Sequence, residues 1–192
     1  MDGAKLRILE AAIAAIEEYG FKNITVRRIA AKADVNVAAI NYYFRTKEQL
    51  LEQVIALTLE NTFDWSDLAY AESLPPKEML FAVIDHLSRN ALNYPEITRA
   101  HYFEAMVNGH TDTQAVTALN GFMETLLQKL RANGCTIPEK TLRLTVTQVF
   151  MAGLFAVGVA PAMFDAFSGI QMANDGDRRQ FLRHLIDCLM AE

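Results

Sequence analysis

The chain has 192 residues, 52% of them hydrophobic and 21% charged, with a formal net charge of −5. Charged residues from Lys5 to Glu18 interrupt the apolar stretch that a signal peptide needs, and two cysteines are too few for a disulfide framework. We therefore expect a cytoplasmic globular protein, with material for one large domain or two small ones.

The charge is unevenly distributed along the chain. Residues 1–47 contain eight Lys and Arg against five Asp and Glu, whereas residues 48–192 contain ten against eighteen. Between residues 22 and 47 there are six basic side chains and a single acidic one, Asp34. A basic segment joined to an acidic body suggests that one end of the protein meets a polyanion.

Four helices are predicted in the first third of the chain. Apolar residues at helical spacing indicate a first helix over residues 4–19, and Gly20 follows it as a C-cap. Thr25 can cap a second helix that ends at Ala33, and Asn36 can cap a third that ends near residue 43. The sequence Thr46-Lys47-Glu48-Gln49 fits a capping box and predicts the start of a long fourth helix.

The remainder of the chain is also predicted to be helical. Pro76 and Pro95 stand where helices can start, and Thr136-Ile137-Pro138-Glu139 fits a second capping box. Residues 144–164 carry no charge, but their polar and glycine residues favour a buried helix ending at Pro161 over a membrane span. A final amphipathic helix includes residues 181–189, so the fold class is all-α with about nine helices.

The second and third helices predict a helix-turn-helix, with a turn of three residues between them. In this motif the second helix enters the major groove of B-DNA with its N-terminal residues first. Small residues at its start allow close approach, Asn41 can pair with adenine, and the hydroxyls of Tyr42 and Tyr43 suit phosphate contacts. Ile40 and Phe44 are predicted to face the core.

The segment ITVRRIAAKADVNVAAINYYFRTKEQLLEQV, residues 24–54, resembles the DNA-binding signature of the tetracycline-repressor (TetR) family of bacterial regulators. The resemblance covers roughly the first 60 residues. It implies a three-helix DNA-binding domain over residues 1–47 and a larger helical ligand-binding and dimerisation domain over residues 48–192. It also implies that DNA is contacted by Thr25, Arg27, Asn36, Val37, Ala38, Asn41, Tyr42, Tyr43 and Lys47.

Three residues depart from the usual pattern of the family. Asp34 stands in the turn where glycine is usual; it tolerates a left-handed backbone but brings negative charge near the DNA. Asn41 stands where tyrosine is common and Tyr43 where histidine is common, so the preference for particular bases does not carry over.

The resemblance implies a homodimer that binds a near-palindromic DNA operator. It also implies that a small, largely apolar effector makes the dimer release the DNA. The last two long helices are the predicted dimer interface, because small residues there permit close helix packing. Apolar and polar residues at helical spacing are candidates for the ligand cavity, although a solid core has the same pattern. They are Phe81, Ile84, His86, Tyr102, Phe103, Met106, Met123, Phe150 and Met151.

Other functions find less support in the sequence. There is no phosphate-binding glycine loop, nucleophile elbow or HExxH motif, so we expect no enzyme and no cofactor. His101 and Glu104, with His110 beyond them, have a spacing that a metal site can use, but polar side chains on the surface have the same pattern more often and we expect no metal. A regulator controlled by a protein partner, or a helical ligand-binding protein without a DNA function, remains an alternative.

Overall fold

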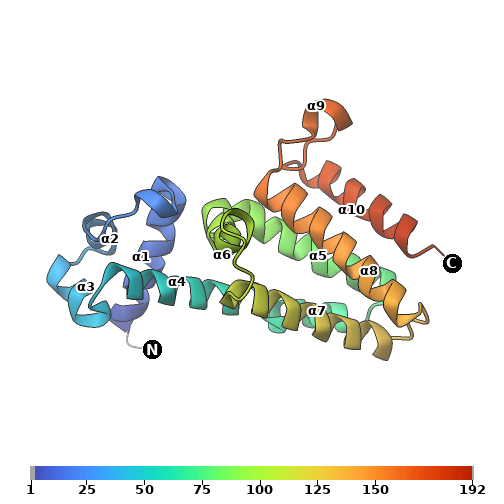
Figure 1. Ribbon diagram of the computed structural model, residues 1–192, viewed down its shortest axis with the longest axis horizontal. Helices are drawn as coiled ribbons and strands as arrows, with labels where there is room; N and C mark the ends of the chain where they lie inside the picture. Colours follow the sequence, from blue (N-terminus) through green and yellow to red (C-terminus); the bar gives the residue numbers. More distant parts are fainter. Residues whose placement is uncertain (1–2, 192) are drawn as a thin grey trace. The chain divides into compact units, whose positions relative to one another are not determined.

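The computed structural model describes residues 3–191, and within them every regular element is a helix, which confirms the all-α class (Figure 1). Contacts between residues divide the chain into two compact units. The first unit is the chain up to Asn61 together with Tyr94–Ala115, and the second is Thr62–Asn93 together with the chain from Val116 onward.

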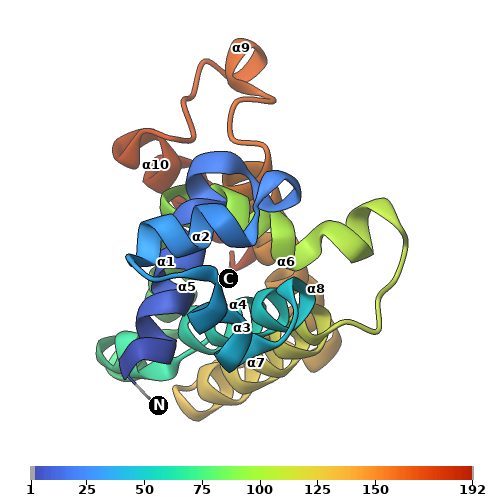
Figure 2. The same cartoon turned by 90° about the vertical axis from the view of Figure 1, so that its left-hand side faces the viewer.

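The first unit is built on helix α1 (Gly3–Tyr19), which packs against α2 (Val26–Ala33) and α6 (Pro95–Val107). A 3-10 turn, η1 (Phe21–Asn23), follows α1, and the short helix α3 (Val37–Phe44) packs on α2 (Figure 2). Helix α4 (Lys47–Thr62) contributes Leu50 and Val54 to the same buried core. The predicted domain boundary after residue 47 therefore falls within this unit.

Helix α6 is fastened to the first unit by polar contacts as well as by apolar packing. Its N-cap residue, Tyr94, provides no side-chain cap. Instead, the carboxylate of Glu17 on α1 accepts hydrogen bonds from the backbone N–H of Glu96 (3.1 Å) and of Ile97 (2.8 Å). A carboxylate at a helix N-terminus satisfies free N–H groups and complements the helix dipole.

The second unit is organised around α5 (Pro76–Asn93), which packs against η2 (Trp65–Ser73), α8 (Glu139–Phe150) and α10 (Asp175–Leu189). Helix α7 (Gln114–Ala132) adds Phe122, Leu126 and Leu130 to its core. A short helix, α9 (Asp165–Ser168), precedes α10.

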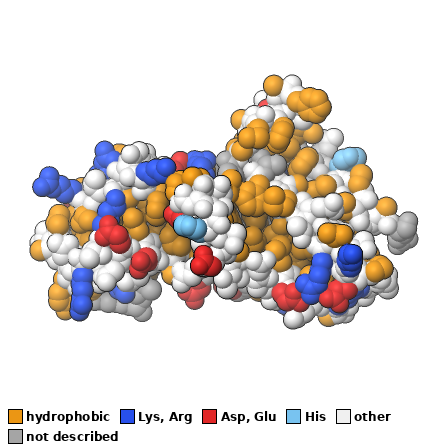
Figure 3. Space-filling view, in the orientation of Figure 1, with side chains coloured by type: hydrophobic (Ala, Val, Ile, Leu, Met, Phe, Trp, Pro, Cys, Tyr) orange, Lys and Arg blue, Asp and Glu red, His pale blue; other side chains and the backbone are white. Residues whose placement is uncertain are grey.

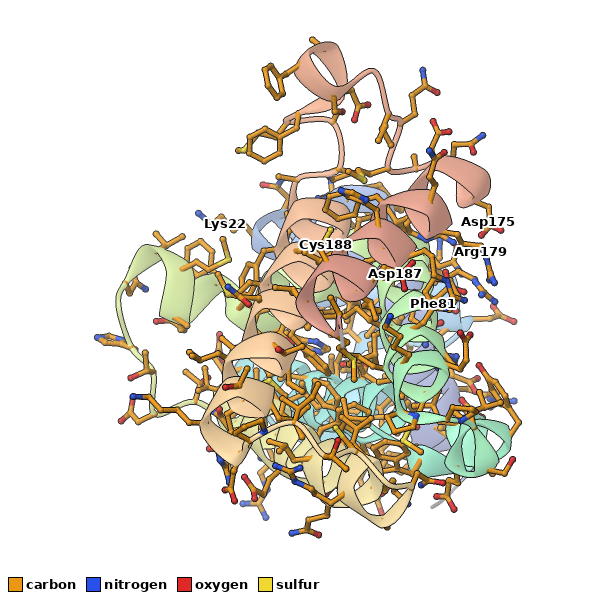
Figure 4. The ribbon with its side chains drawn as sticks, turned by 90° about the vertical axis from the view of Figure 1, so that its right-hand side faces the viewer. Lys22, Phe81, Asp175, Arg179, Asp187 and Cys188 are labelled. Carbon is orange, nitrogen blue, oxygen red and sulfur yellow. The ribbon has the colours of Figure 1, made fainter. Side chains whose placement is uncertain are left out.

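Charged residues tie α5 to α10 in the second unit. The carboxylate of Asp85, which is 3% exposed, accepts from Arg179 (2.6 Å) and Arg89 (2.9 Å). The guanidinium of Arg179 also lies over the ring of Phe81, 5.0 Å from its centroid, as can be followed in Figure 4. These contacts fix the N-terminal half of α10 against α5.

Two expectations for the uncharged run are corrected by the structure. The sequence predicts a single helix up to Pro161, but the structure has α8 followed by a π-helical segment, η3 (Met151–Val159). At the end of η3, Ala160 N–H donates to the carbonyl of Phe155, five residues earlier. The second capping box is also wrong, because Pro138 occupies the N-cap of α8 and that helix start has no side-chain cap.

Within residues 3–191, no helix combines the length and the apolar character that crossing a membrane requires.

Candidate DNA-binding surface

The two short helices of the helix-turn-helix begin at the caps that the sequence predicts. Thr25 Oγ1 accepts from Arg28 N–H at 3.3 Å, and Asn36 Oδ1 accepts from Ala39 N–H at 2.8 Å. Asp34 ends α2 with a left-handed backbone (φ 53°, ψ 49°), and Val35 N–H bonds back to the carbonyl of Ala30. This is the Schellman arrangement, in which glycine is the usual residue at the position of Asp34.

Helix α3 has one buried face and one free face. Ile40 and Phe44 are each 1% exposed and anchor the helix in the core of the first unit, as expected. The opposite face exposes Val37, Ala38 and Asn41, together with Tyr42, whose side chain is 81% exposed. A large aromatic side chain so exposed on a short helix has no role in packing and is available to a partner.

The two adjacent tyrosines have different environments. Tyr42 points into solvent, whereas Tyr43 is half-buried against the core that contains Phe44. Their rings meet edge to face, with centroids 5.2 Å apart. The half-buried ring of Tyr43 is therefore a neighbour of the exposed ring of Tyr42.

The basic side chains of this region fall into two groups. Lys32 forms an ion pair with Glu18 (2.5 Å), and Arg28 donates to the carbonyl of Asn23 (2.7 Å) while stacking on Tyr19. Arg27 and Lys47, by contrast, have no ion pair or hydrogen bond to a side chain within residues 3–191. Many of the blue side chains in Figure 3 lie on its left, over the first unit, and another group lies at its lower right. Arg27 and Lys47 are free to neutralise phosphate charge.

An open groove of about 1060 Å³ lies beside the N-terminus of α2. Thr25, Arg27 and Arg28 line it together with Val37, the first residue of α3. Backbone N–H groups at a helix start attract anions, and Glu18 and Tyr19 of α1 line the same groove. The structure thus brings Thr25, Arg27 and Val37 of the predicted set to one surface.

The remaining predicted DNA contacts, Asn36, Ala38, Asn41, Tyr42, Tyr43 and Lys47, lie on α3 or directly beside its ends. All are exposed except Tyr43 and Lys47, which are half-buried. Their contact with DNA stays a prediction. Sequence reasoning did not find that Glu18 neutralises Lys32, because this pairing joins residues on two different helices.

The candidate ligand residues are divided between the two units. In the second unit Phe81, Ile84 and Phe150 are buried in one apolar core, Met123 packs against it, His86 is half-buried and Met151 is 54% exposed. Burial lowers the pKa of His86, whose Nε2 lies 3.0 Å from Asn90 Nδ2. Tyr102, Phe103 and Met106 belong to α6 of the first unit. Their role in ligand binding stays a prediction.

The histidines weighed as metal ligands have other partners. His101 is buried and lies 2.8 Å from Thr58 Oγ1, whose hydroxyl is also 2.9 Å from the carbonyl of Val54. His101 is thus a buried residue rather than the surface residue that the sequence suggests, and Thr58 is its hydrogen-bond partner. His110 pairs with Glu104 at 3.2 Å. Across the described part of the chain no three His, Cys, Asp or Glu side chains gather as a metal site.

Comparisons with known proteins agree with this geometry. Residues 8–54 match the family described as bacterial regulatory proteins, tetR family. The chain is 31% identical over 128 residues, 65% of its length, to the probable HTH-type transcriptional regulator YttP of Bacillus subtilis. It is 53% identical over 47 residues, 24% of its length, to the HTH-type transcriptional dual regulator CecR of Shigella flexneri. These alignments span 58% and 21% of the two relatives.

Solved structures share the whole fold. The transcriptional regulator FadR from Bacillus subtilis, solved in complex with stearoyl-CoA, superposes with a TM-score of 0.63 over 97% of both chains. Its sequence identity to this chain is 17%, so the likeness establishes the fold alone.

Proposed function

We propose that this chain, in which residues 8–54 match the bacterial regulatory proteins of the tetR family, is a ligand-responsive regulator that binds a near-palindromic operator as a homodimer. In this proposal, binding of a small, largely apolar effector to the second unit releases the DNA. Repression is the expected direction of control. The observation that carries the proposal is the free face of α3, with Asn41 and Tyr42 exposed on a buried anchor.

The free face of α3 has the chemistry of a major-groove reader. The side chains of Val37 and Ala38 are small, so the backbone at the start of α3 can approach base edges. The side chain of Val37 can contact a thymine methyl group. The amide of Asn41, one turn further on, can pair with adenine through two hydrogen bonds. The hydroxyl of Tyr42, together with the free cations Arg27 and Lys47, suits the flanking phosphates.

Effector control has a separate line of support. The second unit has a large apolar core around Phe81, Ile84 and Phe150, which suits an apolar ligand once the core opens. The fold neighbour FadR was solved with stearoyl-CoA, a ligand that joins a long hydrocarbon chain to the polar coenzyme A group. In this proposal each protomer of the dimer contributes one α3, and the two helices bind two operator half-sites about 34–36 Å apart. The effector favours a state in which the separation of the two helices no longer matches that distance.

DNA binding is tested by titrating a labelled duplex, chosen from a random pool by the protein itself, at salt concentrations from about 50 to 200 mM. The affinity of the wild type should fall steeply with salt, and Tyr42→Ala should weaken binding at every concentration. Tyr70→Ala is the matched control, because Tyr70 is 59% exposed but belongs to the second unit. Equal affinity of the Tyr42 and Tyr70 variants would remove the assigned role of α3.

Effector control is tested on the same complex with stearoyl-CoA and with coenzyme A alone. Release of DNA by stearoyl-CoA and not by coenzyme A would support an apolar effector. If DNA stays bound while stearoyl-CoA raises the melting temperature, the ligand binds but does not control DNA. If neither change occurs, long-chain acyl-CoA is excluded as the effector class.

A further inference from the structure

Two residues, Arg45 and Thr46, connect the recognition helix to the helix that follows it. Helix α3 ends at Phe44, and Thr46 already caps α4 by accepting from Gln49 N–H at 3.2 Å. Phe44 and Leu50 are both buried in the core of the first unit, so neither helix can turn freely. The whole change of chain direction therefore falls on Arg45.

The backbone of Arg45 is strained as a result. Its φ of 52° and ψ of −50° lie in a region that side chains with a Cβ rarely adopt, and Thr46 N–H bonds back to the carbonyl of Phe44. This is the geometry of a γ-turn of the rare kind. Glycine would adopt it without a steric penalty. Within residues 3–191, Asp34 and Arg45 are the two non-glycine residues with positive φ, and they flank α3.

The side chain of Arg45 is placed to reach DNA. It directly follows the last residue of α3, a helix that has no charged residue of its own. Arg45 is exposed, and within the described residues its guanidinium has no ion pair or hydrogen bond. A strained backbone at an exposed position without a packing role points to a function for the side chain.

We infer that Arg45 holds a phosphate of the DNA backbone at the C-terminal end of the recognition helix, and that its stiff turn fixes the angle of that helix in the groove. The inference rests on the proposed DNA-binding function. Because α3 enters the groove with its N-terminal end first, its C-terminal end lies nearer the sugar-phosphate wall. Phosphate contacts fix orientation and carry no base preference, so Arg45 adds affinity and positioning to the base reading by Asn41.

The test compares Arg45→Ala, Arg45→Gly and Arg45→Lys with the wild type. Loss of the charge-assisted hydrogen bond in Arg45→Ala should weaken binding about tenfold, equally for the selected duplex and for a shuffled one. The slope of log affinity against log salt should fall by about 0.9 for each protomer bound. Arg45→Lys should keep most of the affinity and the full slope. Lys140→Ala removes an exposed charge from the second unit and should change neither quantity.

The melting temperature distinguishes the effect of the strained backbone at Arg45 from the effect of its positive charge. Arg45→Gly relieves the strain and should melt about 2–4 °C above the wild type, although it binds DNA no better than Arg45→Ala. Arg45→Ala keeps the strain and should melt near the wild type. A stabilised protein that binds DNA more weakly cannot be explained by partial unfolding, so this pairing of opposite effects identifies a functional arginine.

Three results would overturn the inference. The first is an unchanged affinity and salt slope in Arg45→Ala; the second is a loss of binding that depends on duplex sequence, which would make Arg45 a base reader. The third is a lower melting temperature for Arg45→Gly, which would remove the strain argument. If the wild type binds no duplex at all, the proposed DNA-binding function fails as well. If the wild type and Arg45→Ala bind the duplex equally well, only the role of Arg45 is removed.

Discussion

Gly153 of η3 packs closely against α5, and adding one methyl group there tests how the second unit is packed. A Cβ built on Gly153 would lie 2.5 Å from Ile84 Cδ1 and 3.2 Å from Ser88 Oγ. Ile84 and Ser88 are both 0% exposed, and the Ser88 hydroxyl donates to the Gly153 carbonyl at 3.2 Å. The methyl group of Gly153→Ala therefore has no space unless η3 and α5 move apart.

The expected loss of stability combines two opposing effects. Forcing a methyl group into a filled core typically costs about 1–3 kcal/mol. Replacing glycine by alanine within a helix returns up to about 1 kcal/mol through better helix propensity. The net free energy of unfolding should fall by about 1–2 kcal/mol. The control is Gly121→Ala on α7, where an added Cβ meets nothing within 4 Å and stability should rise.

The assay is urea unfolding followed by the fluorescence of Trp65. This is the single tryptophan of the chain, and its ring stacks on Phe122 in the core of the second unit at a centroid distance of 4.8 Å. Combining Gly153→Ala with Ile84→Ala should cost less than the sum of the two changes, because the smaller side chain leaves room for the methyl group. Stabilisation by Gly153→Ala, as in the Gly121 control, would refute the close packing.

Three further changes test the first unit. Asp34→Gly should raise the free energy of unfolding by about 1 kcal/mol, because glycine adopts the left-handed backbone without strain. Asp34→Gly and Asp34→Asn should both bind the duplex more tightly, because each removes a negative charge near the DNA. Equal duplex affinities of the wild type and both variants would contradict this effect of the charge. Glu17→Ala removes the cap of α6 and should cost about 1–2 kcal/mol in urea unfolding, and a loss below about 0.5 kcal/mol would show that the cap is unimportant. Burial lowers the pKa of His101 to about 4, so as pH falls below about 6.5 the unfolded chain takes up a proton that the folded chain does not. Stability should therefore fall by up to about 3 kcal/mol between pH 6.5 and 4, and His101→Gln should reduce that loss; identical pH profiles would exclude this cause.

The helix-turn-helix could be predicted from the sequence because its signals are local. Thr25 and Asn36 accept hydrogen bonds three residues ahead of themselves, so their capping can be recognised without knowing the rest of the fold. The buried face of α3 follows from the spacing of Ile40 and Phe44. Such short-range rules fix the free face of the recognition helix and therefore most of the candidate site.

The features that the sequence did not reveal depend on distant contacts. The cap of α6 joins Glu17 to residues 79 and 80 positions away, and no local pattern marks it. The π-helical segment η3 includes Gly153, which packs closely on α5, whereas its uncharged sequence resembles an ordinary buried helix. Periodicity also cannot separate a ligand cavity from a filled core, so the nine candidate ligand residues stay a prediction.

Selection from a random duplex library by the wild type and by Asn41→Ala tests whether α3 reads DNA sequence. The wild type should enrich a two-fold symmetric site whose half-sites are about one helical turn apart. Asn41→Ala should still enrich a symmetric site but lose its preference at one base pair of each half-site. Enrichment of the same sequence by both proteins would contradict base reading by α3, and no enrichment at about 50 mM salt would contradict specific DNA binding.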